Sequence, residues 1–220
     1  MKVIQKTVLG VAGLALLGGA APAYAAGSQQ VQDVQVQAAP KYKILKNLSY
    51  SGPGNMPLRL GYYNKSKDAG FGWTKIKNKH NITKYSAVQA LTKSPNRKKV
   101  PKSKASYSLT AYAGKYKCSR GVCRLVKQYK VTATVNEEHK GGSKYKFGVV
   151  TEHIIGPERA PNWVTKSLVK LNKKGGRAAT AQKVNGESLV GSYKPLTKTV
   201  KANKAAAADL DYRGSYKLMK

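Results

Sequence analysis

Apolar and polar residues alternate along three stretches in the middle of the chain. Residues 107–113 and 129–135 follow this alternation, and so does the stretch 144–155, which has Glu152 on one face and His153 on the other. A period of two is typical of half-buried strands. We therefore expect an antiparallel meander. Its first turn lies between Cys118 and Cys123, where Gly121 provides a permissive backbone.

Two short segments before these strands have a helical period instead. Trp73, Ile76 and His80 fall at i, i+3 and i+7, which places them on one face of a helix. Thr83 is the expected N-cap of a second helix that ends before Pro95. The buried stripe of this second helix consists of Ala87, Val88 and Leu91.

These elements predict an α+β domain over residues 41–171, in which two short N-terminal helices pack on an antiparallel β-meander of three or more strands. Residues 26–40 are polar and rich in Gln, which favours a flexible, disordered leader. Residues 172–220 are rich in Lys, Ala and Gly, so we expect a mobile basic C-terminal tail.

The first 25 residues have the pattern of a secretory signal peptide. Lys2 and Lys6 precede an apolar run of about 13 residues, and Ala23-Tyr24-Ala25 then provides a small-x-small cleavage site. The run is shorter than the roughly 20 residues that cross a bilayer, so we expect no transmembrane anchor. The sequence predicts a secreted, extracellular protein. Association with the cell wall after export is a second form of this prediction. The alternative is an uncleaved anchoring helix.

Positive charge dominates the chain. The formal net charge is +32, and residues 41–135 contain 22 Lys or Arg but only one acid, Asp68. Such a field attracts anionic polymers, with binding that weakens as salt rises. RNA or another polyanion is therefore the expected partner. DNA, anionic cell-wall polymers and anionic lipid surfaces remain alternatives.

Cys118 and Cys123 are the two cysteines of the chain. In an exported protein they favour a disulfide across the turn. No second Cys or His pair stands at ligand spacing, so we expect no metal and no cofactor. The sequence also lacks a phosphate-binding Gly-rich loop, a Gly-x-Ser-x-Gly elbow and a His-Glu-x-x-His motif, which argues against nucleotide-dependent, serine hydrolase and zinc protease chemistry.

The histidines are the candidates for catalysis. Metal-free cleavage of RNA needs a base, an acid and cationic donors for the phosphate. His80 with His153 or Glu152 would provide the acid and the base. The alternatives are that His80 is a hydrogen-bonded core residue and that His139 lies solvated in a turn. Glu152 and His153 point to opposite faces of a strand, so both reach one substrate only if a bulge intervenes.

The segment from residue 70 to 156 resembles the catalytic core of bacterial toxin ribonucleases of the barnase, EndoU and RelE-like superfamily. The likeness consists of Phe71-Gly72, Ile76 and Lys79-His80, followed by strands. It implies RNA as the substrate, an acidic immunity protein as a partner, and site roles for Lys79 and His80. Lys75 stands where such toxins often have a histidine, so one expected acid–base group is missing. The resemblance then implies that Lys75 binds the phosphate. The wider layout is similar to small secreted proteins of actinobacterial type.

Two functions therefore compete. The first is a secreted cationic toxin that binds nucleic acid and cleaves RNA as a metal-independent endoribonuclease, with Lys75 and Lys79 on the phosphate. The second is a non-enzymatic secreted protein that binds anionic cell-wall polymers, DNA or membrane surfaces.

Overall fold

The computed structural model describes residues 40–139, 144–175 and 185–201. They all belong to the second of the two units of the chain, Gln37–Lys220. The predicted signal peptide, residues 26–39 of the predicted leader and residues 202–220 of the predicted tail lie outside the described residues. Among the helices of the described residues, none is long and apolar enough to span a bilayer.

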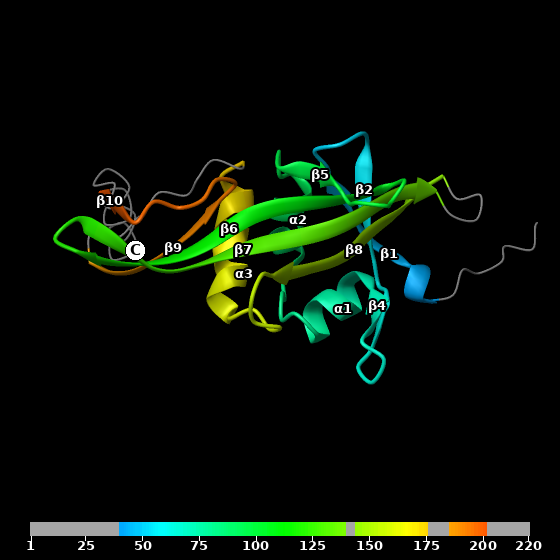
Figure 1. The fold of residues 1–220 in the computed structure, drawn as a ribbon, viewed down its shortest axis with the longest axis horizontal. Helices are drawn as coiled ribbons and strands as arrows, with labels where there is room; N and C mark the ends of the chain where they lie inside the picture. Colours follow the sequence, from blue (N-terminus) through cyan, green and yellow to red (C-terminus); the bar gives the residue numbers. More distant parts are fainter. Residues whose placement is uncertain (1–39, 140–143, 176–184, 202–220) are drawn as a thin grey trace, which may run out of the picture. The chain divides into compact units, whose positions relative to one another are not determined.

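The centre of the fold is a long antiparallel hairpin formed by β6 (Ser106–Ser119) and β7 (Val122–His139) (Figure 1). Each half of this hairpin is widened to four strands. β5 (Arg97–Lys99) and β8 (Lys146–Ile154) flank the half where the hairpin opens. β9 (Gly186–Ser192) and β10 (Thr199–Lys201) flank the half that ends in the turn, which completes a six-stranded sheet.

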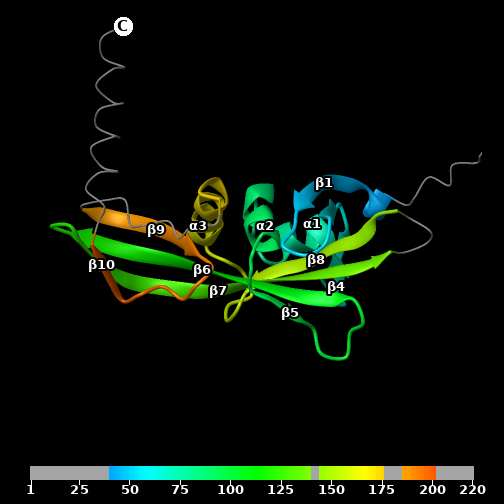
Figure 2. The same ribbon diagram turned by 90° about the horizontal axis from the view of Figure 1, so that it is seen from above.

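Three helices lie on one side of this sheet (Figure 2). They are α1 (Gly72–Asn78), α2 (Tyr85–Thr92) and α3 (Asn162–Lys173). The predicted stripe of α2 is fully buried, and it packs with Leu109 of β6 and Leu168 of α3 in the main core. Two small hairpins precede α1. They are β1 (Ile44–Ser49) with β2 (Asn55–Arg59), and β3 (Tyr62–Asn64) with β4 (Ala69–Phe71).

The predicted arrangement of two N-terminal helices on a meander is wrong. The structure is α+β but mostly β: four strands precede α1, and a third helix follows β8. Two strands, β9 and β10, lie in the range that was predicted to be a tail. They join the sheet because β6 and β7 extend well beyond β5 and β8 and leave edges that need partners.

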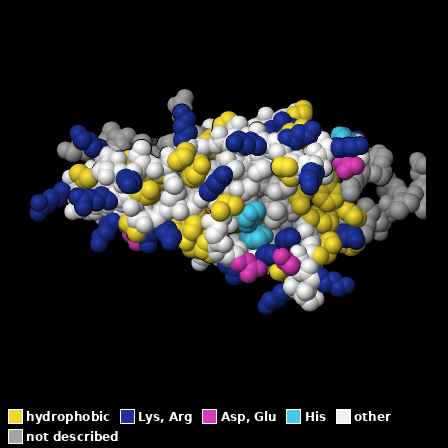
Figure 3. Space-filling view, in the orientation of Figure 1, with side chains coloured by type: hydrophobic (Ala, Val, Ile, Leu, Met, Phe, Trp, Pro, Cys, Tyr) yellow, Lys and Arg dark blue, Asp and Glu magenta, His cyan; other side chains and the backbone are white. Residues whose placement is uncertain are grey.

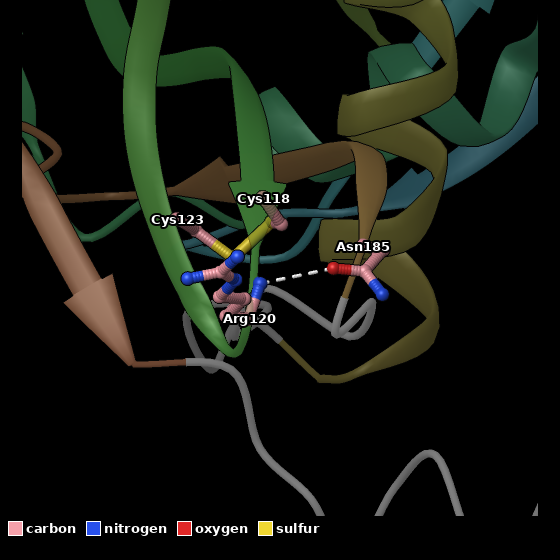
Figure 4. Close-up of a disulfide and its surroundings, with 4 residues drawn as sticks. All are labelled: Cys118, Arg120, Cys123 and Asn185. Carbon is pink, nitrogen blue, oxygen red and sulfur yellow. Dashed lines mark hydrogen bonds between the residues drawn. A yellow bond between two sulfur atoms is a disulfide. The ribbon is translucent and has the colours of Figure 1, made fainter.

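The predicted disulfide between Cys118 and Cys123 is confirmed, and it closes the tip of the β6–β7 hairpin (Figure 4). The two cysteines form a cross-strand pair next to the turn at Arg120 and Gly121. The Arg120 N–H donates to the side-chain oxygen of Asn185 at 2.9 Å. The disulfide also packs with Tyr116 and Val190 in a second, smaller apolar cluster, so it stabilises this half of the sheet locally.

Candidate functional site

The fold brings together His80 and His153, which are far apart in the sequence. His80 follows α1, and His153 lies on β8, against which α1 packs. Their ring centroids are 5.4 Å apart. Figure 3 shows histidine side chains near the centre of one face, beside acidic side chains. We call His80, His153, Lys75 and Lys79 the histidine site.

The periodicity predicted that His80 lies on the helix, and this prediction is wrong. α1 ends at Asn78, and the chain then turns through Asn81, which has a left-handed φ of 58°. Asn is one of the residues that tolerate this conformation. The side-chain N–H of Asn81 donates to the carbonyl of Ala160 at 2.7 Å, and the N–H of Ala160 donates to the carbonyl of His80 at 3.0 Å. The turn is therefore held by the segment that leads into α3.

The environment of His80 fixes the form of its ring. Nδ1 lies 3.2 Å from the main-chain carbonyl of Glu158. A carbonyl only accepts, so Nδ1 carries the proton, and Nε2 of the neutral ring is left as a proton acceptor. The side chain is 8% exposed. Burial lowers the pKa of His80, and the positive charges of His153, Lys79 and Lys75 add to this effect.

His153 is half-buried on β8, and its pKa is lowered in the same direction. Burial is again the main cause, followed by the charges of Lys79 and Lys75. Two imidazoles with lowered pKa values therefore adjoin two lysines. Burial and these positive charges therefore favour the neutral form of both rings.

The lysines of the site differ in how they are engaged. Lys79 forms ion pairs with Asp68 and with Glu158, the latter at 3.7 Å, and its side chain is only 13% exposed. The Nζ of Lys75 makes a longer contact, 3.4 Å, with the main-chain carbonyl of Asp68. Lys75 is therefore the better placed of the two to receive a phosphate, while Lys79 anchors the two acidic side chains.

Glu152 is separated from the histidine site. The register between β7 and β8 shifts at Val150, which has no partner, so a bulge is present. The bulge lies before Glu152 and leaves Glu152 and His153 on opposite faces. The carboxyl group of Glu152 is fully buried, neither oxygen has a hydrogen-bond partner, and burial raises its pKa to about 8. Glu152 therefore does not meet His80 and His153.

Sequence reasoning selected both histidines and both lysines, but it missed Asp68 and Glu158. Asp68 had a signal, since it is the single acid among 22 cations between residues 41 and 135. Glu158 lies in the segment after β8 and acts largely through its main-chain carbonyl, which no side-chain pattern reveals. His139 ends β7 far along the sheet from the site and is exposed, so it is not part of it.

Aromatic side chains form a patch near the start of β8. Phe71 contacts the rings of Tyr42, Tyr62 and Phe147 at centroid distances of 5.7, 5.6 and 4.9 Å. Tyr42 and Tyr62 are 38% and 42% exposed, and the ammonium group of Lys41 lies over both rings. Phe71 ends β4 and directly precedes α1, and Phe147 lies on β8, so two residues of the aromatic patch are on segments that continue to the histidine site.

The described residues contain no group of three or more His, Cys, Asp or Glu side chains able to hold a metal ion. No protein-family model, curated protein or solved structure matches this chain.

Proposed function

We propose that this chain is a secreted cationic ribonuclease that cleaves RNA at the histidine site. The observation that carries the proposal is the contact between His80 and His153, two acid–base groups that the fold brings together beside lysines. Transphosphorylation of RNA needs a base and an acid on either side of one phosphate, and paired imidazoles supply both when one ring is neutral and the other is protonated.

The hydrogen bonding of the site supports one assignment of roles. His80, with Nδ1–H held by the Glu158 carbonyl, takes the proton of a ribose 2′-hydroxyl at Nε2. The 2′-oxygen then attacks phosphorus while the bond from phosphorus to the 5′-oxygen breaks. Protonated His153 gives its proton to that 5′-oxygen. The products are a 2′,3′-cyclic phosphate and a free 5′-hydroxyl, and Lys75 stabilises the charge on the phosphate oxygens.

The aromatic patch supports a nucleic acid as the bound polymer. Bases stack on exposed tyrosine rings, a contribution of about 1–3 kcal/mol per base, whereas wall polymers have no bases to stack. Lys41 lies over the rings of Tyr42 and Tyr62, where it would meet the phosphates that flank such bases. The disulfide supports export, because disulfides persist in oxidising compartments.

One observation favours a second candidate function. His80 is nearly buried and donates to a main-chain carbonyl, as many structural histidines do. If His80 only holds the turn against the segment before α3, the chain is a non-enzymatic cationic protein that binds anionic wall polymers, DNA or membrane surfaces. The positive charge alone would serve that function.

Cleavage of a fluorogenic single-stranded RNA in the presence of a chelator distinguishes the two functions. We expect His153→Ala to reduce cleavage by about a hundredfold or more, the usual effect of losing a general acid or base. Binding of the same RNA with 2′-O-methyl sugars should change little. The partly exposed position of His153 makes this variant more informative than His80→Ala, which also loses the contact with Glu158.

His139→Ala is the matched control, because His139 is exposed and distant from the site. It should cleave like the wild type. Detection of a 2′,3′-cyclic phosphate end identifies the reaction and excludes a contaminating nuclease that leaves other ends. A wild-type protein that binds RNA but leaves it intact, or a His153→Ala variant as active as the wild type, would establish the binding protein instead.

A further inference from the structure

A groove of about 770 Å³ lies between the start of α2 and one face of α3, and Leu189 of β9 closes one side of it. α3 presents residues 162, 165, 166, 169, 170 and 173 to this groove, which follow the helical spacing of a single face. We call this feature the α2–α3 groove. It is distinct from the histidine site and from the aromatic patch.

The charge of the α2–α3 groove is one-sided. Four lysines line it, and none of its lining residues is acidic. They are Lys84, Lys166, Lys170 and Lys173. Lys84 is also the N-cap of α2, so the positive end of this helix dipole lies at the same end of the groove. The complementary ligand is an anion that spans several positive charges.

The wall of the groove is not purely ionic. Val169 and Leu189 provide half-buried apolar surface. Thr165 also lines the groove, and its buried hydroxyl makes no hydrogen bond with any described residue. Apolar surface beside lysines and a hydroxyl suits a chain that carries both flat bases and phosphates, whereas a simple inorganic anion would use only the charges.

One end of the groove adjoins the histidine site. Asn162 lines the groove, and its side-chain oxygen accepts a hydrogen bond from the side-chain N–H of Asn81 at 3.1 Å. Asn81 directly follows His80 in the chain. This hydrogen bond therefore joins the segment that directly follows His80 to one end of the groove.

We propose that the α2–α3 groove binds the single-stranded segment of RNA that continues from the bond cleaved at the histidine site. This inference rests on the proposed function for its substrate. Single-stranded RNA fits better than a duplex, because the bases of a duplex are stacked inside the helix and do not reach an apolar wall. Phosphates of the segment contact the lysines, and a base or sugar contacts Val169, Leu189 and the Thr165 hydroxyl.

The test compares two triple variants with equal loss of charge. Lys84→Ala, Lys166→Ala and Lys173→Ala together remove three exposed lysines of the groove. Lys98→Ala, Lys99→Ala and Lys102→Ala remove three exposed lysines at β5 and the turn after it. Fluorescence anisotropy with a 12-nucleotide 2′-O-methyl RNA should show at least a tenfold loss of affinity for the groove variant and less than threefold for the control.

Thr165→Val provides a second variant that keeps the shape of the side chain. Its thermal stability should equal or slightly exceed that of the wild type, because the variant removes a buried hydroxyl that has no hydrogen-bond partner in the described residues. Its affinity for the RNA should fall about threefold to tenfold, the scale of one hydrogen bond. An affinity equal to that of the wild type, or equal losses in the two triple variants, would overturn the inference.

Substrate length separates this inference from the proposed function. The groove variant should cleave a dinucleotide as fast as the wild type but a 12-nucleotide RNA at least tenfold more slowly in kcat/KM. If the wild type cleaves nothing, the ribonuclease proposal fails, yet a selective loss of 2′-O-methyl RNA binding in the groove variant still supports the groove. If that variant loses binding to vesicles of anionic lipid but not to RNA, the groove is a lipid site and the inference is wrong.

Discussion

At the scale of single residues, the carboxyl group of Glu152 is unusual because it is buried without a hydrogen-bond partner. It faces the core side of β8, and burial raises its pKa to about 8. The folded protein therefore holds a proton on Glu152 at a pH where the unfolded chain has already released it. Between about pH 4.5 and 8, the free energy of unfolding should fall as the pH rises.

Replacing Glu152 with Met tests this effect. Wild-type stability should decline by up to about 1.4 kcal/mol per pH unit across this window, and Glu152→Met should remove that component. The variant should also be more stable at pH 8, because an apolar side chain of similar size leaves no buried polar group without a partner. Urea unfolding at pH 5, 6, 7 and 8 measures both. The exposed Glu138→Gln is the control, and parallel pH profiles for wild type and Glu152→Met would contradict the prediction.

The two histidines predict an acidic optimum for cleavage. Burial and nearby positive charges lower the pKa of His80 and of His153 below 6.5. The general acid must be protonated, so kcat/KM should be greatest below pH 6.5 and should decline as the pH rises through the higher of the two pKa values. A pH profile of kcat/KM measures this.

The pH profile of kcat/KM for Lys75→Ala tests whether the charge of Lys75 lowers the pKa values of the two histidines. Removal of this charge should raise both histidine pKa values and move the alkaline limb of the profile to higher pH, even though cleavage becomes slower. A variant of the exposed Lys77, which neighbours Lys75 in the chain, should leave the limb in place. An optimum at pH 7 or above in the wild type would be inconsistent with the proposed acid and base.

At the scale of elements, α3 depends on β9 for its position. An added Cβ at Gly191 would lie 2.5 Å from the main-chain oxygen of Ser167 and 2.7 Å from the Cβ of Leu171. Gly191→Ala should therefore push α3 away from the sheet and lower the free energy of unfolding by about 1–3 kcal/mol, the range for overpacking. Because α3 also lines the α2–α3 groove, affinity for RNA should fall in the same variant.

Glu187→Ala is the control on the same strand. Glu187 is 62% exposed in its ion pair with Lys115, and such surface pairs contribute about 0–1 kcal/mol. Urea unfolding of the two variants should therefore separate them clearly. A Gly191→Ala variant as stable as Glu187→Ala would mean that α3 and β9 do not pack as closely as the structure shows.

The same elements show what could be predicted from the sequence. Alternation identified β6, β7 and β8 because each strand has one face on the core, and the stripe of α2 was clear for the same reason. β9 was not predicted, because its sequence, Gly-Glu-Ser-Leu-Val-Gly-Ser, has little apolar content. Its position is set by the edge of β6 and by the close approach of α3 to Gly191. β3 and β4 have three residues each, too few for a period to appear.

The candidate site was predicted in its residues but not in its geometry. Lys79 and His80 were selected from their resemblance to a toxin motif, and His153 from its place on a strand. The expected helical position of His80 was wrong. Local periodicity contains no information about the turn at Asn81 or about the hydrogen bond from Asn81 to Ala160 that stabilises this turn. Glu152 was included because it precedes His153, whereas burial of its carboxyl group depends on how the strand packs.

At the scale of the whole molecule, the excess of positive charge governs how RNA would bind. The formal net charge is +32, and Lys79, Arg97 and Lys115 are among the cations that form ion pairs. Each phosphate that contacts a lysine or arginine releases condensed counterions, and for a single strand the slope of log affinity against log salt is about −0.7 per contact. The four groove lysines, Lys75 and Lys41 suggest about six contacts, hence a slope near −4.

Titrations of the 12-nucleotide 2′-O-methyl RNA at salt concentrations from 50 to 500 mM should therefore show affinity falling by about four orders of magnitude. The groove triple variant should bind with a slope shallower by about 2, because three contacts are lost, whereas the Lys98, Lys99 and Lys102 variant should retain the wild-type slope. A wild-type slope near zero would exclude phosphate contacts as the source of affinity. Equal reductions in both variants would mean that the charge acts as a diffuse field, with no path for the strand on the surface.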